Sequence, residues 1–329
     1  MITVLRCAVL ALFISAGVQA QTASPEQVPA PAVVKTVHPE VKAPVAAKVS
    51  VTFPPGAGVM HIPLAQSKKT LEVFTYQPVG ADETTPVVMV MTGVDRNAAT
   101  YRNDWMTVAD QYHLRVVVPH FSEQDFPGAA GYNLGNLVDS KTHHRQPKSQ
   151  WAFSIVDNIF TTLQKQGVTS QKQYYLFGNS AGCQFVHRML TLLPQPNVKA
   201  AVCAAAGWWT LPDTDQRWPY GLREAPVAVS QQQLDDYFAK PVLIAVGAED
   251  DDPENHLLRK SKQAMAQGAN RLDRAESYFT TSQQRAEQNN TPFNWHFVDL
   301  SDVGHSGSKM SVFAAGQFAW FEQHNAFHL

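Results

Sequence analysis

Residues 174–182 are Tyr174-Tyr175-Leu176-Phe177-Gly178-Asn179-Ser180-Ala181-Gly182, an apolar run of strand type that continues directly into a glycine-rich turn. The stretch that follows, 183–193, has the composition of a helix. Strand, turn and helix in this order form the G-x-S-x-G pattern, in which a strained turn lifts a serine hydroxyl above a sheet. Glycines are needed at both ends of the pattern because a Cβ there would collide with neighbouring backbone. The pattern predicts a nucleophile at Ser180, and the alternative is a glycine-rich turn without chemistry.

The rest of the chain alternates short apolar runs with amphipathic stretches. This alternation is typical of an α/β fold with a mostly parallel central sheet and helices on both faces. We expect core strands at 86–91, 115–119, 174–177, 199–204 and 241–246, and a last strand at 294–300. Helices are expected along Trp151, Ile155, Ile159 and Leu163, after Ser180, and at 312–323. A single domain, 51–329, accounts for this pattern.

A reactive serine needs a base to take its proton and a carboxylate to orient that base. The expected strand 241–246 runs into Gly247-Ala248-Glu249-Asp250-Asp251-Asp252-Pro253. This places carboxylates at the C-terminal end of a strand, where parallel sheets assemble their sites. We favour Asp250, because a tight turn at Gly247 would swing the third residue after it towards the cleft. Asp251 and Asp252 remain alternatives.

The expected base is His305, which follows the last strand in the run Asp302-Val303-Gly304-His305-Ser306-Gly307. The surrounding glycines allow this loop to carry the imidazole across to the serine. The oxyanion formed by attack on a carbonyl needs backbone N–H donors. We expect these from Ala181, at the start of the helix, and from Val94, in Thr92-Gly93-Val94-Asp95-Arg96 after a strand. A plain strand-to-helix turn is the alternative for the second loop.

At these residues the chain resembles the α/β-hydrolases, and more narrowly the poly(3-hydroxybutyrate) depolymerase-like serine esterases. The resemblance runs from about Thr70 to the C-terminus and includes Phe126-Pro127-Gly128 and Tyr132-Asn133-Leu134-Gly135-Asn136. It implies nucleophile Ser180, acid Asp250, base His305 and oxyanion donors near Val94 and Ala181. The chain departs from the family in having Thr92-Gly93 where His-Gly is usual. We expect no cofactor and no metal, because neither paired ligand spacing nor a phosphate-binding glycine loop is present.

An aromatic-rich segment, about 208–240, occupies the position where this fold usually inserts a lid. Aromatic walls with few charges favour an uncharged aliphatic or aromatic ester, or a polyester fragment. Trp208, Trp209 and Tyr132 are the expected substrate contacts, and the alternative is that these rings belong to the core. A serine peptidase or amidase with the same triad, and a non-catalytic binding protein on the same fold, remain alternative functions.

The N-terminus has the pattern of an export signal. Arg6 precedes an apolar run at 8–18, and Val18-Gln19-Ala20 predicts cleavage after Ala20, which implies a secreted or periplasmic protein. Residues 21–50 are rich in Pro and Ala and indicate an extended, disordered linker. The cysteines that follow, Cys183 and Cys203, could form a disulfide or remain buried thiols.

Charge and composition narrow the class of partner. The formal net charge is -2 and 44% of the residues are hydrophobic, as in a globular enzyme. Nucleic acid is not an expected partner because no basic stripe is present. No segment beyond the signal is apolar for the length of a membrane span.

Overall fold

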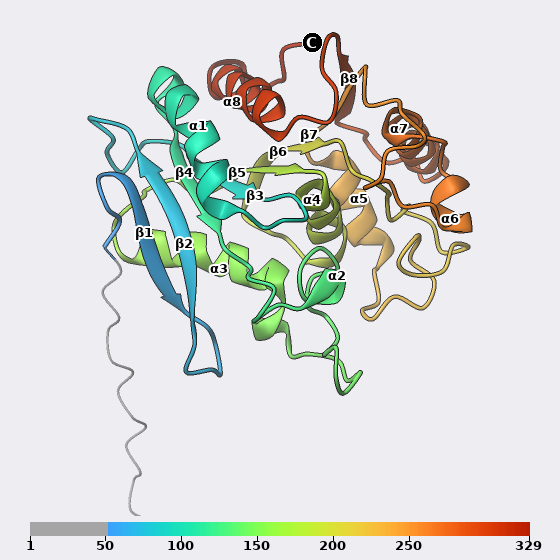
Figure 1. Cartoon of the computed structure of the whole chain (residues 1–329), viewed down its shortest axis with the longest axis horizontal. Coiled ribbons are helices and arrows are strands. Elements are labelled where there is room, and N and C mark those ends of the chain that lie inside the picture. The colour runs from blue at the N-terminus through green and yellow to red at the C-terminus, as the bar shows by residue number, and fades with distance from the viewer. Residues whose placement is uncertain (1–51) are drawn as a thin grey trace, which may run out of the picture. The chain divides into compact units, whose positions relative to one another are not determined.

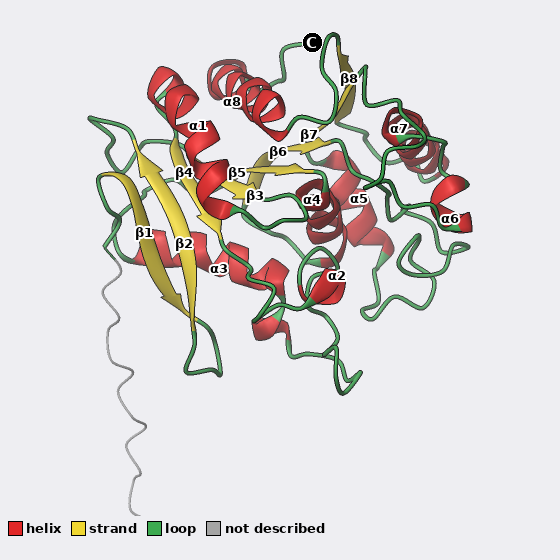
Figure 2. Ribbon diagram, viewed as in Figure 1, coloured by secondary structure: helices red, strands yellow, loops and turns green. Residues whose placement is uncertain are grey.

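The computed structural model describes residues 52–329, and its centre is an eight-stranded sheet in the order β1-β2-β4-β3-β5-β6-β7-β8 (Figures 1 and 2). The expected signal at 1–20 and linker at 21–50 lie outside the described residues. β1 and β2 pair antiparallel with each other, β2 pairs antiparallel with β4, and every later pairing is parallel. The strands are β1 (Gly56–Pro63), β2 (Thr70–Gln77), β3 (Val87–Met91), β4 (Arg115–Pro119), β5 (Tyr174–Asn179), β6 (Val198–Ala204), β7 (Val242–Gly247) and β8 (Trp295–Leu300). This confirms the expected mostly parallel α/β sheet.

Helices cover both faces of the sheet, and a separate hydrophobic core lies on each face. Successive side chains of a strand point to opposite faces, so Met89 of β3 joins one core and Val88 and Val90 join the other. The first core is completed by α3 (Ala152–Lys165), α4 (Ala181–Leu192), α5 (Gln231–Ala239) and α7 (Arg271–Gln288). The second is completed by α1 (Ala98–Tyr112) and α8 (Gly307–His324). The short helical segments are α2 (Gly128–Gly131), η1 (Lys148–Gln150) and α6 (Lys262–Met265).

The core strands match the sequence expectation, whereas several peripheral elements were not expected. The hairpin of β1 and β2 adds an antiparallel edge, and β1 buries only two of its eight residues. Such a half-exposed strand lacks the continuous apolar run that marks the central strands. Helix α7 was also not expected, because its buried face includes Arg271 and Arg274 and therefore has no apolar stripe.

Across residues 52–329, the helices are each too short or too polar to cross a bilayer.

Candidate active site

The turn between β5 and α4 has the geometry of the predicted nucleophile position. Ser180 adopts φ 56° and ψ -116°, a strained conformation for a residue with a side chain. A Cβ on Gly178 would lie 2.3 Å from the Gly182 carbonyl oxygen, and a Cβ on Gly182 would lie 2.1 Å from that of Met91. Both glycines are therefore required by close backbone contacts. The second contact seats the start of α4 against the end of β3.

His305 lies between Ser180 and Asp250. Its Nε2 is 3.1 Å from the Ser180 Oγ, and its Nδ1 is 2.7 Å from the Asp250 Oδ2. Because a carboxylate only accepts hydrogen bonds, Nδ1 carries the proton and Nε2 is free to accept the serine proton. The three residues follow the C-terminal ends of three different strands, β5, β7 and β8, and the structure brings together the whole set that the sequence suggested. Their catalytic roles remain predictions.

Among the three adjacent aspartates, only Asp250 turns inward. It is 4% exposed, whereas Asp251 and Asp252 are exposed to solvent. The N–H of Asp250 donates to the Gly247 carbonyl oxygen at 3.0 Å, which closes the expected tight turn after β7. A Cβ on Gly247 would lie 2.0 Å from the Val303 carbonyl oxygen. The glycine thus also admits the loop that carries His305.

Arg271 is a site residue that sequence reasoning missed. Its side chain is 2% exposed, and Nη1 donates to the second oxygen of Asp250, Oδ1, at 3.0 Å. Nη2 donates to the Asn255 Oδ1 at 3.3 Å. The two carboxylate oxygens of Asp250 are therefore held from two sides, by His305 and by Arg271. No local sequence motif marks an arginine for this position, because the contact joins the start of α7 to the loop after β7.

The expected oxyanion donors both border the same pocket as Ser180. Ala181 is the first residue of α4, so its N–H is not used by the helix. Val94 is 59% exposed, in the loop after β3. Tyr132 supports this loop, because its buried hydroxyl donates to the Thr92 carbonyl oxygen at 2.8 Å. Burial raises the pKa of Tyr132, so the phenol stays neutral. The donor roles of Val94 and Ala181 remain predictions.

The pocket at Ser180 has a volume of about 300 Å³. Trp208 and Tyr132 are in its lining, as expected for substrate contacts. Trp209 is not, and the expectation for this residue is wrong. It is fully buried, and its ring stacks on Tyr278 with centroids 4.2 Å apart. The two adjacent indoles pack in different places: Trp209 joins the core on one face of the sheet, and Trp208 packs against Tyr220 at the pocket.

The pocket is also more charged than its aromatic composition suggested. The charged side chains in its lining are Arg96, Glu123, Arg259 and Arg271. Arg96 pairs with Glu123 at 3.0 Å, and Arg271 pairs with Asp250. Positive charge therefore predominates around Ser180.

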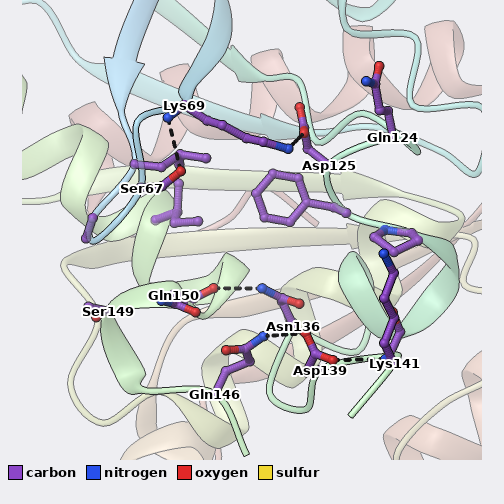
Figure 3. A pocket seen from close by; sticks show the side chains of 16 residues that line it. Ser67, Lys69, Gln124, Asp125, Asn136, Asp139, Lys141, Gln146, Ser149 and Gln150 are labelled. Carbon is purple, nitrogen blue, oxygen red and sulfur yellow. Dashed lines mark hydrogen bonds and ion pairs between the residues drawn. The ribbon is translucent and has the colours of Figure 1, made fainter. Parts of the chain in front are cut away.

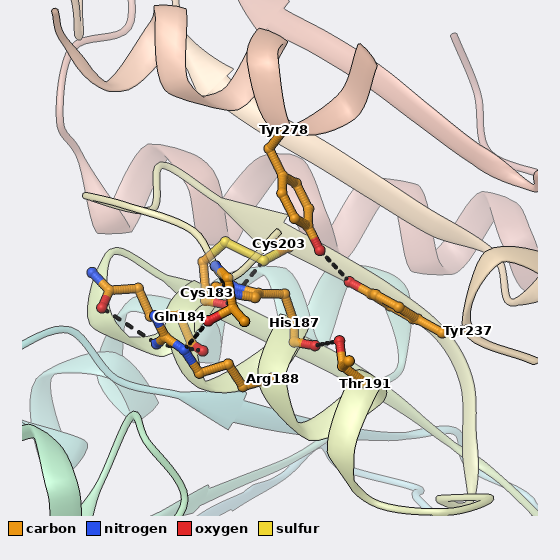
Figure 4. The surroundings of a disulfide bond; sticks show 9 residues. Cys183, Gln184, His187, Arg188, Thr191, Cys203, Tyr237 and Tyr278 are labelled. Carbon is orange, nitrogen blue, oxygen red and sulfur yellow. Dashed lines mark hydrogen bonds between the residues drawn. A yellow bond between two sulfur atoms is a disulfide. The ribbon is translucent and has the colours of Figure 1, made fainter. Parts of the chain in front are cut away.

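Cys183 of α4 and Cys203 of β6 form a disulfide bond (Figure 4). The sequence left open a disulfide or two buried thiols, and the structure has the disulfide. His187 lies one helical turn further along α4, and the ligand atoms of these three residues lie within 4.8 Å of one another. A disulfide has no thiolate to offer a metal ion, so this group is a structural cross-link behind the nucleophile.

A second pocket, of about 430 Å³, lies beside the hairpin loop after β1 (Figure 3). Its lining is mostly polar and includes Lys69, which forms an ion pair with Asp125. Asp125 and Pro127 line this pocket, while Glu123 and Gly128 line the pocket at Ser180. The same loop thus has a pocket on either side, and Ser180 opens into one of them.

Comparison with known proteins identifies a family of ester-hydrolysing enzymes. Residues 65–299 match the family model described as "Putative esterase". A poly(aspartic acid) hydrolase-1 from Sphingomonas sp. KT-1 is 34% identical, with a TM-score of 0.76 over 82% of this chain and 100% of that chain. A poly(3-hydroxybutyrate) depolymerase from Bordetella parapertussis is 32% identical, with a TM-score of 0.75 over 82% of this chain and 92% of that chain. An S-formylglutathione hydrolase from Agrobacterium tumefaciens is 14% identical, with a TM-score of 0.54 over 84% of this chain and 98% of that chain, and shares the fold. Among proteins with curated descriptions, none matches the chain.

Proposed function

The chain belongs to this esterase family and is an ester-hydrolysing enzyme of the α/β-hydrolase fold, and from that premise we propose that it cleaves carboxylic esters through an acyl-enzyme on Ser180. The observation that carries the proposal is the position of His305. Its Nε2 lies 3.1 Å from the Ser180 Oγ while its Nδ1 lies 2.7 Å from Asp250. These are the contacts that a base needs in order to accept a proton in a fixed orientation.

The proposed reaction has two halves. The Ser180 Oγ attacks the ester carbonyl carbon as its proton passes to the His305 Nε2, and Asp250 stabilises the resulting imidazolium. The N–H groups of Ala181 and Val94 receive the oxyanion. The intermediate then expels the alcohol, which takes its proton from His305. A water molecule repeats the sequence on the acyl-enzyme, releasing the acid and restoring the Ser180 hydroxyl.

For the substrate, we propose aliphatic or aromatic esters, including polyester fragments. Trp208 makes part of the pocket wall aromatic, which suits an acyl chain, and one relative is a poly(3-hydroxybutyrate) depolymerase. A second candidate is amide hydrolysis with the same residues, favoured by the relative that is a poly(aspartic acid) hydrolase. Comparing kcat/KM for an ester and an amide with identical acyl groups separates the two functions.

Labelling with a fluorophosphonate probe tests the nucleophile. The probe should modify wild-type protein, and peptide mapping should locate the adduct on Ser180. Ser180→Ala should lose both labelling and ester hydrolysis, while Ser170→Ala, which changes an exposed serine, should keep both. An adduct on another residue, or full ester hydrolysis by Ser180→Ala, would refute the proposal.

We also propose that the protein is exported to the periplasm or the medium, with removal of residues 1–20. The support is the charged start, apolar run and small residues before Gln21. N-terminal sequencing of protein recovered outside the cytoplasm should begin at Gln21. A start at Met1 would contradict the proposal.

A further inference from the structure

Three arginines without a carboxylate partner meet at the Gly207–Trp208 corner of the pocket. Within residues 52–329, Arg188, Arg259 and Arg274 take part in none of the ion pairs, in contrast to Arg96 and Arg271. Unpaired charge of one sign in a partly desolvated site is costly, and proteins keep it where it has a use. Among residues 52–329, therefore, no carboxylate pairs with the arginines of this corner.

Arg188 provides the buried part of this charge. Its side chain is fully buried and is held by neutral groups, with Nε donating to the Thr210 Oγ1 at 2.7 Å and Nη1 to the Asn133 carbonyl oxygen at 3.0 Å. Its Nη2 has no partner among the described residues. The guanidinium Cζ lies 4.1 Å from the centre of the Trp208 ring. Burial lowers the pKa of Arg188, and the nearby charge of Arg259 lowers it further.

Arg259 provides the solvent-accessible part of this positive charge. It is exposed and lines the same pocket as Ser180. Its Nε donates to the Tyr220 hydroxyl at 2.6 Å, and its Cζ lies 5.0 Å from the centre of the Trp208 ring. The buried Arg274 fixes the backbone here, since Nη2 donates to the Arg259 carbonyl oxygen at 3.0 Å and Nη1 to that of Gly207 at 2.5 Å. Arg259 is therefore held in place through its Nε and its backbone. Within the described chain, both of its terminal nitrogens remain free of hydrogen bonds.

We propose that Arg259 binds a carboxylate of the substrate, so that the enzyme prefers esters that carry a free acid group over neutral esters. A guanidinium fork binds a carboxylate through two parallel hydrogen bonds. A substrate carboxylate would also offset the charge of Arg188, whose guanidinium lies against the Trp208 ring. This inference rests on the proposed ester hydrolysis and replaces the expectation of an uncharged substrate. The alternative is that Arg259 only stacks on Trp208 and Tyr220.

The test compares two esters of equal chain length, monomethyl adipate and dimethyl adipate, by methanol release. Wild-type protein should have the higher kcat/KM for monomethyl adipate, although that molecule offers one ester bond instead of two. In Arg259→Gln the ratio of the two kcat/KM values should fall about tenfold, which corresponds to about 1.4 kcal/mol. Arg259→Lys keeps the charge without the fork and should lose less. Arg145→Gln removes an exposed arginine outside the pocket lining and should keep the wild-type ratio.

An Arg259→Gln ratio equal to that of the wild type would overturn the inference, because stacking alone does not distinguish the two esters. Calorimetric binding of the adipate dianion gives a second measurement that needs no turnover. Binding should weaken about tenfold in Arg259→Gln and stay unchanged in Arg145→Gln. If neither ester were cleaved while this binding difference was found, the proposed function would fail and the carboxylate site would stand. A different result would be cleavage of dimethyl adipate by wild type but not by Ser180→Ala, with the kcat/KM ratio and adipate binding unchanged in Arg259→Gln. The proposed ester hydrolysis would then stand and the carboxylate site would fail.

Discussion

Asp250 and Asp251 are adjacent and chemically identical, and they differ in what surrounds them. The carboxylate of Asp250 contacts His305 and Arg271, whereas Asp251 is exposed. We expect Asp250→Asn to lower kcat for ester hydrolysis by about 10³ to 10⁴, because an amide can hold the wrong tautomer of the imidazole. Asp251→Asn should stay within about twofold of wild type, as for most exposed substitutions. Steady-state kinetics on one ester checks both variants. A larger loss of kcat in Asp251→Asn than in Asp250→Asn would show that Asp250 is not the triad acid.

His187 should make stability depend on pH. Its Nδ1–H donates to the Cys183 carbonyl oxygen at 2.9 Å, and its Nε2 accepts from the Thr210 N–H at 3.0 Å, so the ring must be neutral. Burial lowers the pKa of His187 well below its ordinary value. As pH falls below about 6.5, His187 becomes protonated in the unfolded chain but stays neutral in the folded protein. Stability is therefore lost towards acid pH.

The expected loss from His187 is about 1 kcal/mol in the free energy of unfolding between pH 7.5 and pH 5.5. Urea denaturation at both pH values measures it. His187→Gln should show a smaller loss than wild type by about this amount, whatever its stability at pH 7.5. His61→Gln, which alters an exposed histidine, should keep the wild-type dependence. Equal pH dependence in all three proteins would show that His187 is not the group responsible.

At the scale of elements, the contact between α4 and β3 holds the nucleophile near the predicted oxyanion loop. A Cβ at Gly182 would lie 2.1 Å from the Met91 carbonyl oxygen and 2.8 Å from that of Thr92, and backbone atoms cannot move aside cheaply. Gly182→Ala should therefore shift α4 and lower kcat/KM about a hundredfold or more, since displacements near 1 Å have costs of this order. Its melting temperature should also fall.

Gly316→Ala is the matched control, because Gly316 lies inside α8 and its nearest neighbour, the Tyr112 hydroxyl, is at 3.5 Å. It should keep activity and gain up to about 1 kcal/mol of stability from helix propensity. Circular dichroism melts and ester kinetics check both variants. If Gly182→Ala had wild-type kinetics, the close approach of Gly182 to the Met91 carbonyl oxygen would not be needed for activity.

Strands and helices differ in how readily the sequence revealed them. The five central parallel strands were expected within a residue or two, because burial on both faces produces short, continuous apolar runs. Helix α7 was not predicted, because its buried face mixes Arg271 and Arg274 with small residues and Tyr278. Arg271 binds the side chains of Asp250 and Asn255, and Arg274 binds backbone oxygens. In a one-dimensional pattern such buried arginines look like solvent-facing charges.

For the whole molecule, we expect that a chain starting at Val51 folds and keeps its activity. Residues 52–329 belong to one compact unit, and they include both hydrophobic cores and all the residues around Ser180. The free energy of unfolding and kcat/KM of the shortened protein should match those of the chain starting at Gln21. A loss of either would show that 21–50 contributes to the folded domain.

Sequence patterns were sufficient for the central strands, the serine turn and the choice of His305 as the predicted base, because continuous apolar runs, a G-x-S-x-G turn and a glycine-flanked histidine are local features. Folding in three dimensions had to select Asp250 from three aspartates, join Cys183 to Cys203, bury Trp209 and gather the unpaired arginines. Each of these depends on contacts between distant residues, such as the 55 positions that separate Asp250 from His305. Local composition does not encode which of several equivalent side chains ends up facing such a partner.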